Sequence, residues 1–102
     1  MNKPVYFDYA AATPTDKRVI DAMVKCLSIE GTFANPHAKD HVYGWQAAEA
    51  VEKAREQVAN LIGASPLEIT FTSGATESNN LAIFGLAQAL KQSGDKRNHI
   101  IT

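Results

Sequence analysis

The sequence contains a single cysteine, Cys26, so no disulfide can form within the chain. Such sparse use of cysteine suits a reducing compartment such as the cytosol. Residues 1–8 contain one lysine and none of the apolar run that a secretory signal peptide needs. The rest of the chain lacks any hydrophobic run long enough to suggest a membrane span. We therefore expect a soluble, cytoplasmic protein.

An excess of charge of one sign is also missing. The chain has 10 lysines and arginines against 11 aspartates and glutamates, a formal net charge of -1, and the two signs are interspersed. This excludes the basic footprint of a nucleic-acid-binding protein. The 102 residues, 45% of them hydrophobic and 21% charged, have an ordinary globular composition and allow at most one small domain.

The most informative stretch is residues 68–80, where the hydrophobic period changes. Apolar residues alternate with threonines over residues 69–72, as they do in a strand. After Gly74 the apolar residues recur at helical spacing: Leu81, Ile83, Phe84, Leu86, Ala87 and Leu90. We interpret the stretch as a strand, a tight turn at Gly74 and the start of a helix.

Such a helix start can bind an anion. Its first backbone N–H groups lack intrahelical acceptors and stand at the positive end of the helix dipole. Gly74 lets the backbone bend and a ligand approach, and the hydroxyls of Ser73, Thr76 and Ser78 can add donors. The same small polar residues, with Glu77 in the first turn, also suit an ordinary capped helix. The local residues leave both interpretations open.

Three further segments precede this stretch. Val5–Tyr9 is short and β-prone, and we predict an extended arm or edge strand. A helix should follow, capped by Thr13, beginning at Pro14 and ending near Glu30-Gly31. Its apolar face needs a packing partner: Val19, Ile20, Met23, Val24 and Leu27.

Residues 31–41 have no regular period and form a long loop, which is either functional or disordered. His37 and His41 in this loop are four residues apart, but no further ligand is near, so we predict no metal site and interpret them as solvated. Residues 42–62 have a strong helical period with a small, alanine-rich stripe, and Gly63 is the expected stop. Trp45 fits core packing better than a pocket wall.

The C-terminal part completes a predicted βαβ unit. The helix after Thr76 should run to Ser93-Gly94, and His99–Thr102 begins a second strand parallel to the first. Two strands and three helices are too few for a parallel sheet that is covered on both faces. We therefore expect the chain to be the front of a longer one.

Several motifs in this order resemble the N-terminal quarter of a cysteine desulfurase of the NifS/IscS type, within the class V aminotransferase family. The resemblance covers all 102 positions and rests on Tyr6-Phe7-Asp8-Tyr9, Ala12-Thr13-Pro14, Gly31-Thr32-Phe33, Asn35-Pro36, His41 with Gly44-Trp45-Gln46-Ala47, and Phe71-Thr72-Ser73-Gly74-Ala75-Thr76-Glu77-Ser78. The chain departs from the family at Ala34, where glycine is usual, and at residues 37–40, where a serine-rich run is common.

The resemblance implies an α/β fold: the N-terminal part of a pyridoxal-phosphate-dependent transferase of fold type I, whose parallel-sheet large domain is incomplete here. Residues 1–15 would be an arm that contributes to the small domain or the dimer, and residues 16–102 the start of the large domain. The phosphate of pyridoxal 5'-phosphate would bind at Ala75 and Thr76, with Gly74 in the same turn. Asn35 and His41 would lie near the active site without a catalytic role.

The implied reaction of the parent enzyme removes sulfur from L-cysteine, giving alanine and an enzyme persulfide for iron–sulfur cluster assembly and other sulfur delivery. The parent would be a homodimer that serves an iron–sulfur scaffold or another sulfur-acceptor protein. The Schiff-base lysine, the ring-stacking histidine and the acceptor cysteine would lie beyond Thr102, so we expect no catalytic residue here and no activity of the segment alone. Cys26, which lacks an adjacent base, is interpreted as a small packed residue.

Three alternatives stay open at this point. A selenocysteine lyase or another class V aminotransferase relative would share the same motifs, because the deciding cysteine loop is absent from the sequence. A non-catalytic fragment that binds a partner chain would need that partner to cover its apolar helix faces.

Overall fold

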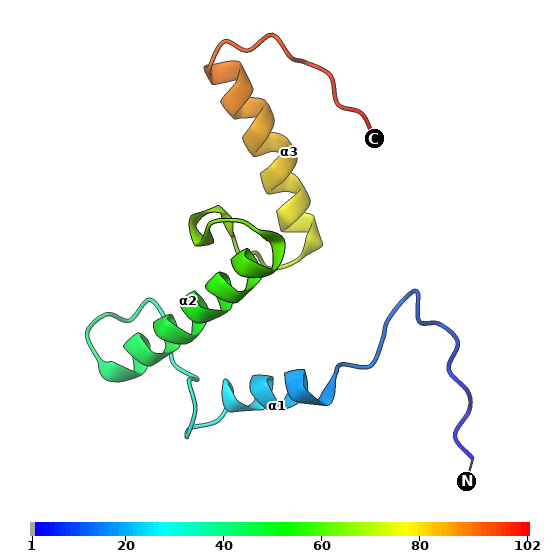
Figure 1. The fold of residues 1–102 in the computed structure, drawn as a ribbon, viewed down its shortest axis with the longest axis vertical. Helices are drawn as coiled ribbons and strands as arrows, with labels where there is room; N and C mark the ends of the chain where they lie inside the picture. Colours follow the sequence, from blue (N-terminus) through cyan, green and yellow to red (C-terminus); the bar gives the residue numbers. More distant parts are fainter. Residues whose placement is uncertain (1) are drawn as a thin grey trace. The chain divides into compact units, whose positions relative to one another are not determined.

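The computed structural model describes residues 2–102 and contains three α-helices and one short 3-10 helix (Figure 1). These are α1 (Lys17–Lys25), α2 (Val42–Ile62), η1 (Pro66–Glu68) and α3 (Ala75–Gln92). The chain divides into two compact units, residues 1–66 and 67–102. Within residues 2–102, no helix combines the length and the apolar character needed to cross a membrane.

Helix α1 is shorter than the sequence predicts at both ends. Its N-cap is Asp16, and not Thr13, because the Asp16 carboxylate accepts the backbone N–H of Arg18 at 2.8 Å. The Arg18 guanidinium also donates to this carboxylate, which lowers the pKa of Asp16. The helix ends at Lys25, and not near Glu30, because the chain turns back. The backbone N–H of Thr32 donates to the carbonyl oxygen of Lys25 at 3.3 Å.

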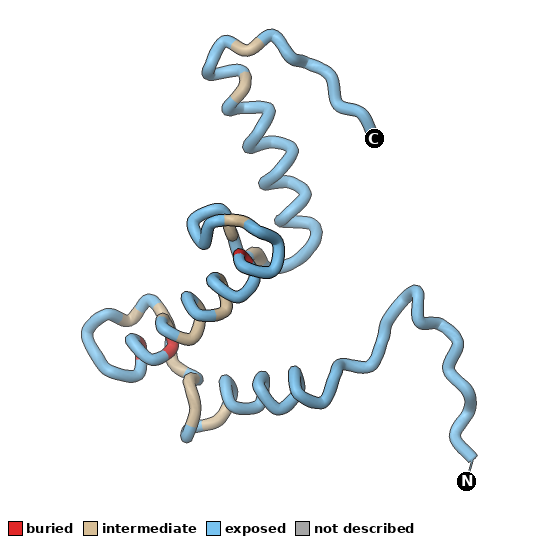
Figure 2. The backbone as a smooth tube through the Cα atoms, viewed as in Figure 1, coloured by how far each residue is buried: buried red, intermediate tan, exposed pale blue. Residues whose placement is uncertain are grey.

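Helix α2 confirms the prediction over its whole length. It begins after His41 and ends at Gly63, which has the left-handed conformation (φ 70°) that favours glycine at a helix stop. Ala47 of the predicted stripe and Ala59, which was not predicted to belong to it, are buried, with exposed fractions of 4% and 0%. Gly44 is the third buried residue of α2, and Figure 2 shows most of the helix as half-buried or exposed.

Helix α3 begins one residue before the predicted Thr76 and ends at Gln92, close to the predicted stop at Ser93-Gly94. Gly94 is in the left-handed region (φ 73°). No residue of α3 is buried, and Figure 2 shows almost all of the helix as exposed.

Neither of the two predicted strands is present among residues 2–102, and the edge-strand alternative for Val5–Tyr9 is not observed either. Glu68 belongs to η1, and residues 69–72 and 99–102 have no regular secondary structure. The predicted βαβ unit and its parallel sheet are therefore not formed among residues 2–102. The physical reason is that two parallel strands make a weak pair unless further strands and covering helices support them.

The predicted arm curls into a turn instead of extending as a strand. The backbone N–H of Ala11 donates to the carbonyl oxygen of Asp8 at 3.0 Å. The Tyr6 hydroxyl lies 2.7 Å from the same oxygen, and the ring of Tyr6 meets the ring of Tyr9 edge-on with centroids 5.0 Å apart. Met1 of this arm lies outside the described residues.

The apolar face of α1 is exposed along its length, although the sequence predicts that it packs. Cys26 is exposed as well, so its prediction as a packed residue is wrong in this structure. It lines an open hollow along α1 together with Val19, Ala22, Met23 and Leu27. Cys26 thus shares an apolar face that the described residues do not cover.

Candidate functional site

The turn before α3 presents the backbone groups that the sequence predicts for an anion site. Gly74 is the N-cap of α3 and no side chain caps the helix. Ser78 donates its backbone N–H to the carbonyl oxygen of Gly74 at 3.1 Å, which is the first bond of the helix. The backbone N–H groups of Ala75, Thr76 and Glu77 precede it and therefore have no intrahelical acceptor.

Of the two roles that we predicted for Gly74, the room for a ligand is supported, whereas the backbone bend is not. Its φ of 163° and ψ of -176° describe extended backbone, which any residue can adopt, so the bend does not require glycine. A Cβ built at Gly74 would meet no atom within 4 Å. What the glycine provides is open space next to the first turn of α3, where a ligand can approach the backbone.

The structure separates the three hydroxyls that were predicted as donors to an anion. The Ser73 hydroxyl donates to Glu77 Oε2 at 2.6 Å. The Ser78 hydroxyl pairs with Thr72 Oγ1 at 2.5 Å. Thr76 Oγ1 has no hydrogen-bond partner among residues 2–102. The Asn80 side chain donates to the Thr76 carbonyl oxygen at 2.8 Å and does not involve that hydroxyl.

Backbone N–H groups without acceptors and one uncommitted hydroxyl thus lie together at the start of α3. The positive end of an 18-residue helix dipole adds to them. Three of these groups belong to the first two residues of α3. They are the N–H groups of Ala75 and Thr76 and the hydroxyl of Thr76. This arrangement suits the oxygens of a phosphate or a similar anion.

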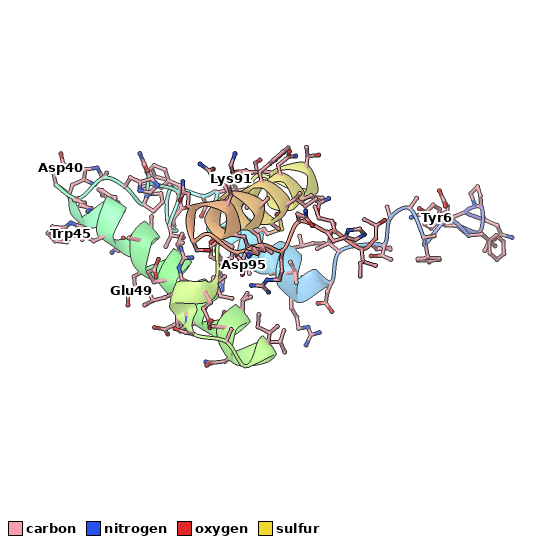
Figure 3. The ribbon with its side chains drawn as sticks, turned by 90° about the horizontal axis from the view of Figure 1, so that it is seen from above. Tyr6, Asp40, Trp45, Glu49, Lys91 and Asp95 are labelled. Atoms are coloured by element: carbon pink, nitrogen blue, oxygen red, sulfur yellow. The ribbon has the colours of Figure 1, made fainter. Side chains whose placement is uncertain are left out.

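The loop before α2 is folded onto the first turn of that helix. The Trp45 indole N–H donates to the carbonyl oxygen of Lys39 at 2.7 Å, and Figure 3 shows Trp45 beside the part of the loop that carries Asp40. Gly44 is buried at the point where the loop passes closest to α2. A Cβ added to Gly44 would lie 1.9 Å from the Ala38 carbonyl oxygen. The loop is therefore built into the helix start.

Two predictions about this loop are corrected. Trp45 is 57% exposed and not part of a core, because its hydrogen bond holds it at the loop surface. His41 is not merely solvated, because its Nδ1 accepts the backbone N–H of Gly44 at 3.1 Å and caps α2. The sequence carried no signal for this cap, because the side chains expected at an N-cap are serine, threonine, aspartate and asparagine. Asn35, on the same loop, accepts the backbone N–H of His37 at 2.9 Å.

Metal ligation has no geometric support in the described part of the chain. No group of three or more histidine, cysteine, aspartate or glutamate side chains is close enough to hold an ion among residues 2–102.

Glu77 offers a direct test of the geometry of the turn. Its pKa lies below the ordinary value of 4.5, chiefly because the Ser73 hydroxyl donates to the carboxylate and secondly because the Ser73 backbone N–H does. These bonds stabilise the turn while Glu77 is ionised, and the stabilisation is lost as the pH falls through the lowered pKa. We expect an NMR titration of the Glu77 carboxyl carbon in this chain to have its midpoint below 4.5.

Ser73→Ala should move that midpoint up towards 4.5, because it removes the larger cause of the shift. Ser78→Ala is the matched control, since it removes a hydroxyl that does not contact Glu77. An unchanged midpoint in Ser73→Ala would show that the bond is absent in solution.

Residues 5–102 match the family described as aminotransferase class-V, and the chain belongs to this family. It is similar over its whole length to proteins named cysteine desulfurase IscS. The identity is 55% to the protein of Pseudomonas syringae pv. tomato, 57% to that of Acinetobacter baumannii and 57% to that of Pseudoalteromonas translucida. All 102 residues are covered in each comparison, and the chain spans 24% of the length of each relative.

Proposed function

We propose that the chain is the first part of a cysteine desulfurase. The enzyme takes the sulfur atom of L-cysteine onto a thiol of its own, so that alanine is released and the thiol becomes a persulfide. The observation that carries the proposal is the identity of 55–57% over every residue to relatives with that name. No residue of the chain is assigned a catalytic role.

We propose pyridoxal 5'-phosphate as the cofactor and the start of α3 as its phosphate site. The residues present fit a phosphate, because Ala75 and Thr76 offer N–H groups without intrahelical acceptors and Thr76 Oγ1 makes no other hydrogen bond among residues 2–102. The open space at Gly74 leaves the approach clear. When bound, pyridoxal phosphate supplies the electron sink for bond breaking in amino-acid substrates. The chain's own part is to bind and orient its phosphate.

The exposed apolar faces support a larger α/β fold of type I. Residues 16–102 would begin the large domain, and residues 1–15 would be an arm to the small domain or the dimer. Residues 69–72 and 99–102 would become strands once further strands flank them, because a parallel sheet is stable when both of its faces are covered. The enzyme would be a cytoplasmic homodimer that delivers sulfur to an iron–sulfur scaffold or another acceptor protein.

A hybrid enzyme tests this proposal. Residues 1–102 replace the equivalent segment of the Pseudomonas syringae relative, and cofactor content and alanine release from L-cysteine are measured. We expect the hybrid enzyme to retain bound pyridoxal phosphate and to form alanine at a rate of the same order as that relative. A folded hybrid enzyme that binds no cofactor would contradict the proposal.

Cys26→Ala in the hybrid enzyme is the control for the thiol of this chain. We expect unchanged alanine release, because Cys26 closes helix α1 and the persulfide is proposed to form on a different thiol. Loss of activity in a folded, cofactor-loaded variant would instead assign the sulfur-accepting role to Cys26.

A further inference from the structure

Two hydrogen-bonded clamps cross the turn at Gly74, and neither uses the groups proposed to bind phosphate. In the first, Glu77 Oε2 accepts both the backbone N–H of Ser73 at 2.7 Å and the Ser73 hydroxyl at 2.6 Å. One carboxylate oxygen in the first turn of α3 is thereby tied to the residue before the N-cap. We call this pair of bonds the 73–77 clamp.

The second clamp joins the residue before Ser73 to the end of the same helical turn. Thr72 Oγ1 lies 3.2 Å from the Gly74 carbonyl oxygen, to which it donates, and 2.5 Å from Ser78 Oγ. Because the Thr72 hydroxyl has one proton, the Ser78 hydroxyl must be the donor in the second contact. The Gly74 carbonyl also accepts the backbone N–H of Ser78, so this peptide group is held from two sides. We call this set the 72–78 clamp.

We propose that the two clamps are positioning devices for the cofactor phosphate, and that Glu77 acts through Ser73 without touching the phosphate. This inference rests on the proposed function. A carboxylate in the first turn of a helix is attracted to the unsatisfied N–H groups there. Glu77 is bound to Ser73 instead, so the N–H groups of Ala75 and Thr76 stay available for the phosphate.

The negative charge of Glu77 makes this role distinguishable from direct binding. A carboxylate near a phosphate repels it. If Glu77 acted only by lying beside the phosphate, removing its charge should improve cofactor binding. The clamp predicts the opposite for Glu77→Ala, because without the carboxylate both bonds to Ser73 are lost and only the 72–78 clamp still restrains the turn. Glu77→Gln should restore binding, since its amide oxygen can still accept both Ser73 donors.

The experiment measures the dissociation constant of pyridoxal phosphate for the hybrid enzyme, from the absorbance of bound cofactor after equilibrium dialysis. We expect Glu77→Ala to bind about tenfold more weakly, the size of effect that losing one hydrogen bond to a charged group produces. Glu77→Gln should bind as the unmodified hybrid enzyme does. If Glu77→Ala does not fold, Ser73→Ala serves in its place, with a smaller loss because the backbone N–H of residue 73 remains.

The positioning role of the 73–77 clamp would be contradicted if Glu77→Ala bound the cofactor as tightly as the unmodified hybrid enzyme. It would also be contradicted if Glu77→Gln weakened cofactor binding as much as Glu77→Ala. If Glu77 only stabilises the helix, both variants should have a lower melting temperature and an unchanged dissociation constant for the cofactor. That result would also contradict the proposed positioning role. The proposed function fails separately, when the unmodified hybrid enzyme binds no cofactor. A hybrid enzyme that binds cofactor, loses it with Thr76→Val and keeps it with Glu77→Ala would reject only the clamp.

Discussion

Thr76→Val in the hybrid enzyme is expected to weaken the binding of pyridoxal phosphate by about 10- to 100-fold. A hydrogen bond to a charged group contributes about 1.5–3 kcal/mol, and each 1.4 kcal/mol changes a dissociation constant about tenfold. Thr76 has the one hydroxyl in this turn that is not engaged elsewhere among residues 2–102, whereas Ser73 and Ser78 are held by the clamps. No neighbouring hydroxyl is therefore free to replace it.

Valine keeps the β-branched shape of Thr76, so the substitution removes the hydroxyl and little else. The bond from the Asn80 side chain goes to the Thr76 carbonyl oxygen and should persist. Thr76→Ser is the matched control, because it retains the hydroxyl and should bind the cofactor nearly as well as threonine. Equal affinity in Thr76→Val and the unmodified hybrid enzyme would remove Thr76 from the phosphate site.

Gly44→Ala should detach the loop from the start of α2. An added Cβ would lie 1.9 Å from the Ala38 carbonyl oxygen and 2.9 Å from Ala38 Cβ. Backbone atoms cannot rotate away as a flexible side chain can, so the loop itself must move. Overpacking a tight site lowers the free energy of unfolding by about 1–3 kcal/mol. Because the added Cβ of Gly44→Ala would meet rigid backbone, we expect a cost at the upper end of this range. The helix start would survive, since alanine favours helix more than glycine does.

The measurement is hydrogen exchange of the Trp45 indole N–H in the 102-residue chain, followed by NMR. This proton is bonded to the Lys39 carbonyl oxygen, so its exchange should accelerate when the loop moves away. Gly85→Ala is the matched control, because Gly85 is also helical but a Cβ there meets no atom within 4 Å. That control should stabilise α3 by up to about 1 kcal/mol. Unchanged exchange in Gly44→Ala would show that the close approach is not maintained.

The helices that the sequence predicted best are those with local signals at both ends. The predicted bounds of α2 agree with the structure because a long helical period of apolar residues is followed by the stop signal Gly63. Both signals depend only on residues that are close in sequence. Helix α1 was misplaced because Thr13 before a proline was interpreted as its cap, whereas the helix is capped by Asp16, three residues later. A side-chain hydrogen bond to Arg18 decided between them, and no periodicity reports such a bond.

The strands and the burial of single residues could not be predicted in the same way. Apolar and polar residues alternate over 69–72 as they do in a strand. A strand, however, forms only when it is hydrogen-bonded to a partner strand, and residues 2–102 form no sheet. Trp45 was assigned to a core because of its residue type and Cys26 because it lacks an adjacent base, yet burial depends on which distant segments cover a residue. Family resemblance supplied the likeness to a desulfurase, which local patterns alone did not contain.

The candidate site shows a similar division. The sequence located the helix start and its available N–H groups, because the first N–H groups of any α-helix lack intrahelical acceptors. It treated Ser73, Thr76 and Ser78 as equivalent donors, since the partner of a hydroxyl depends on side-chain torsions that the sequence does not encode locally. Their separation into two engaged hydroxyls and one uncommitted hydroxyl emerged from the structure. The role of Thr76 as a phosphate ligand stays a prediction.

The cap on α2 also fixes the tautomer of an imidazole. Since His41 Nδ1 accepts the backbone N–H of Gly44, the neutral ring must carry its proton on Nε2. A metal ion binds a ring nitrogen that has no proton, so Nε2 could become a ligand only after the proton moved to Nδ1. That shift would break the bond to Gly44 and release the first turn of the helix. Coordination of a metal ion by His41 and capping of this helix by the same imidazole therefore exclude each other.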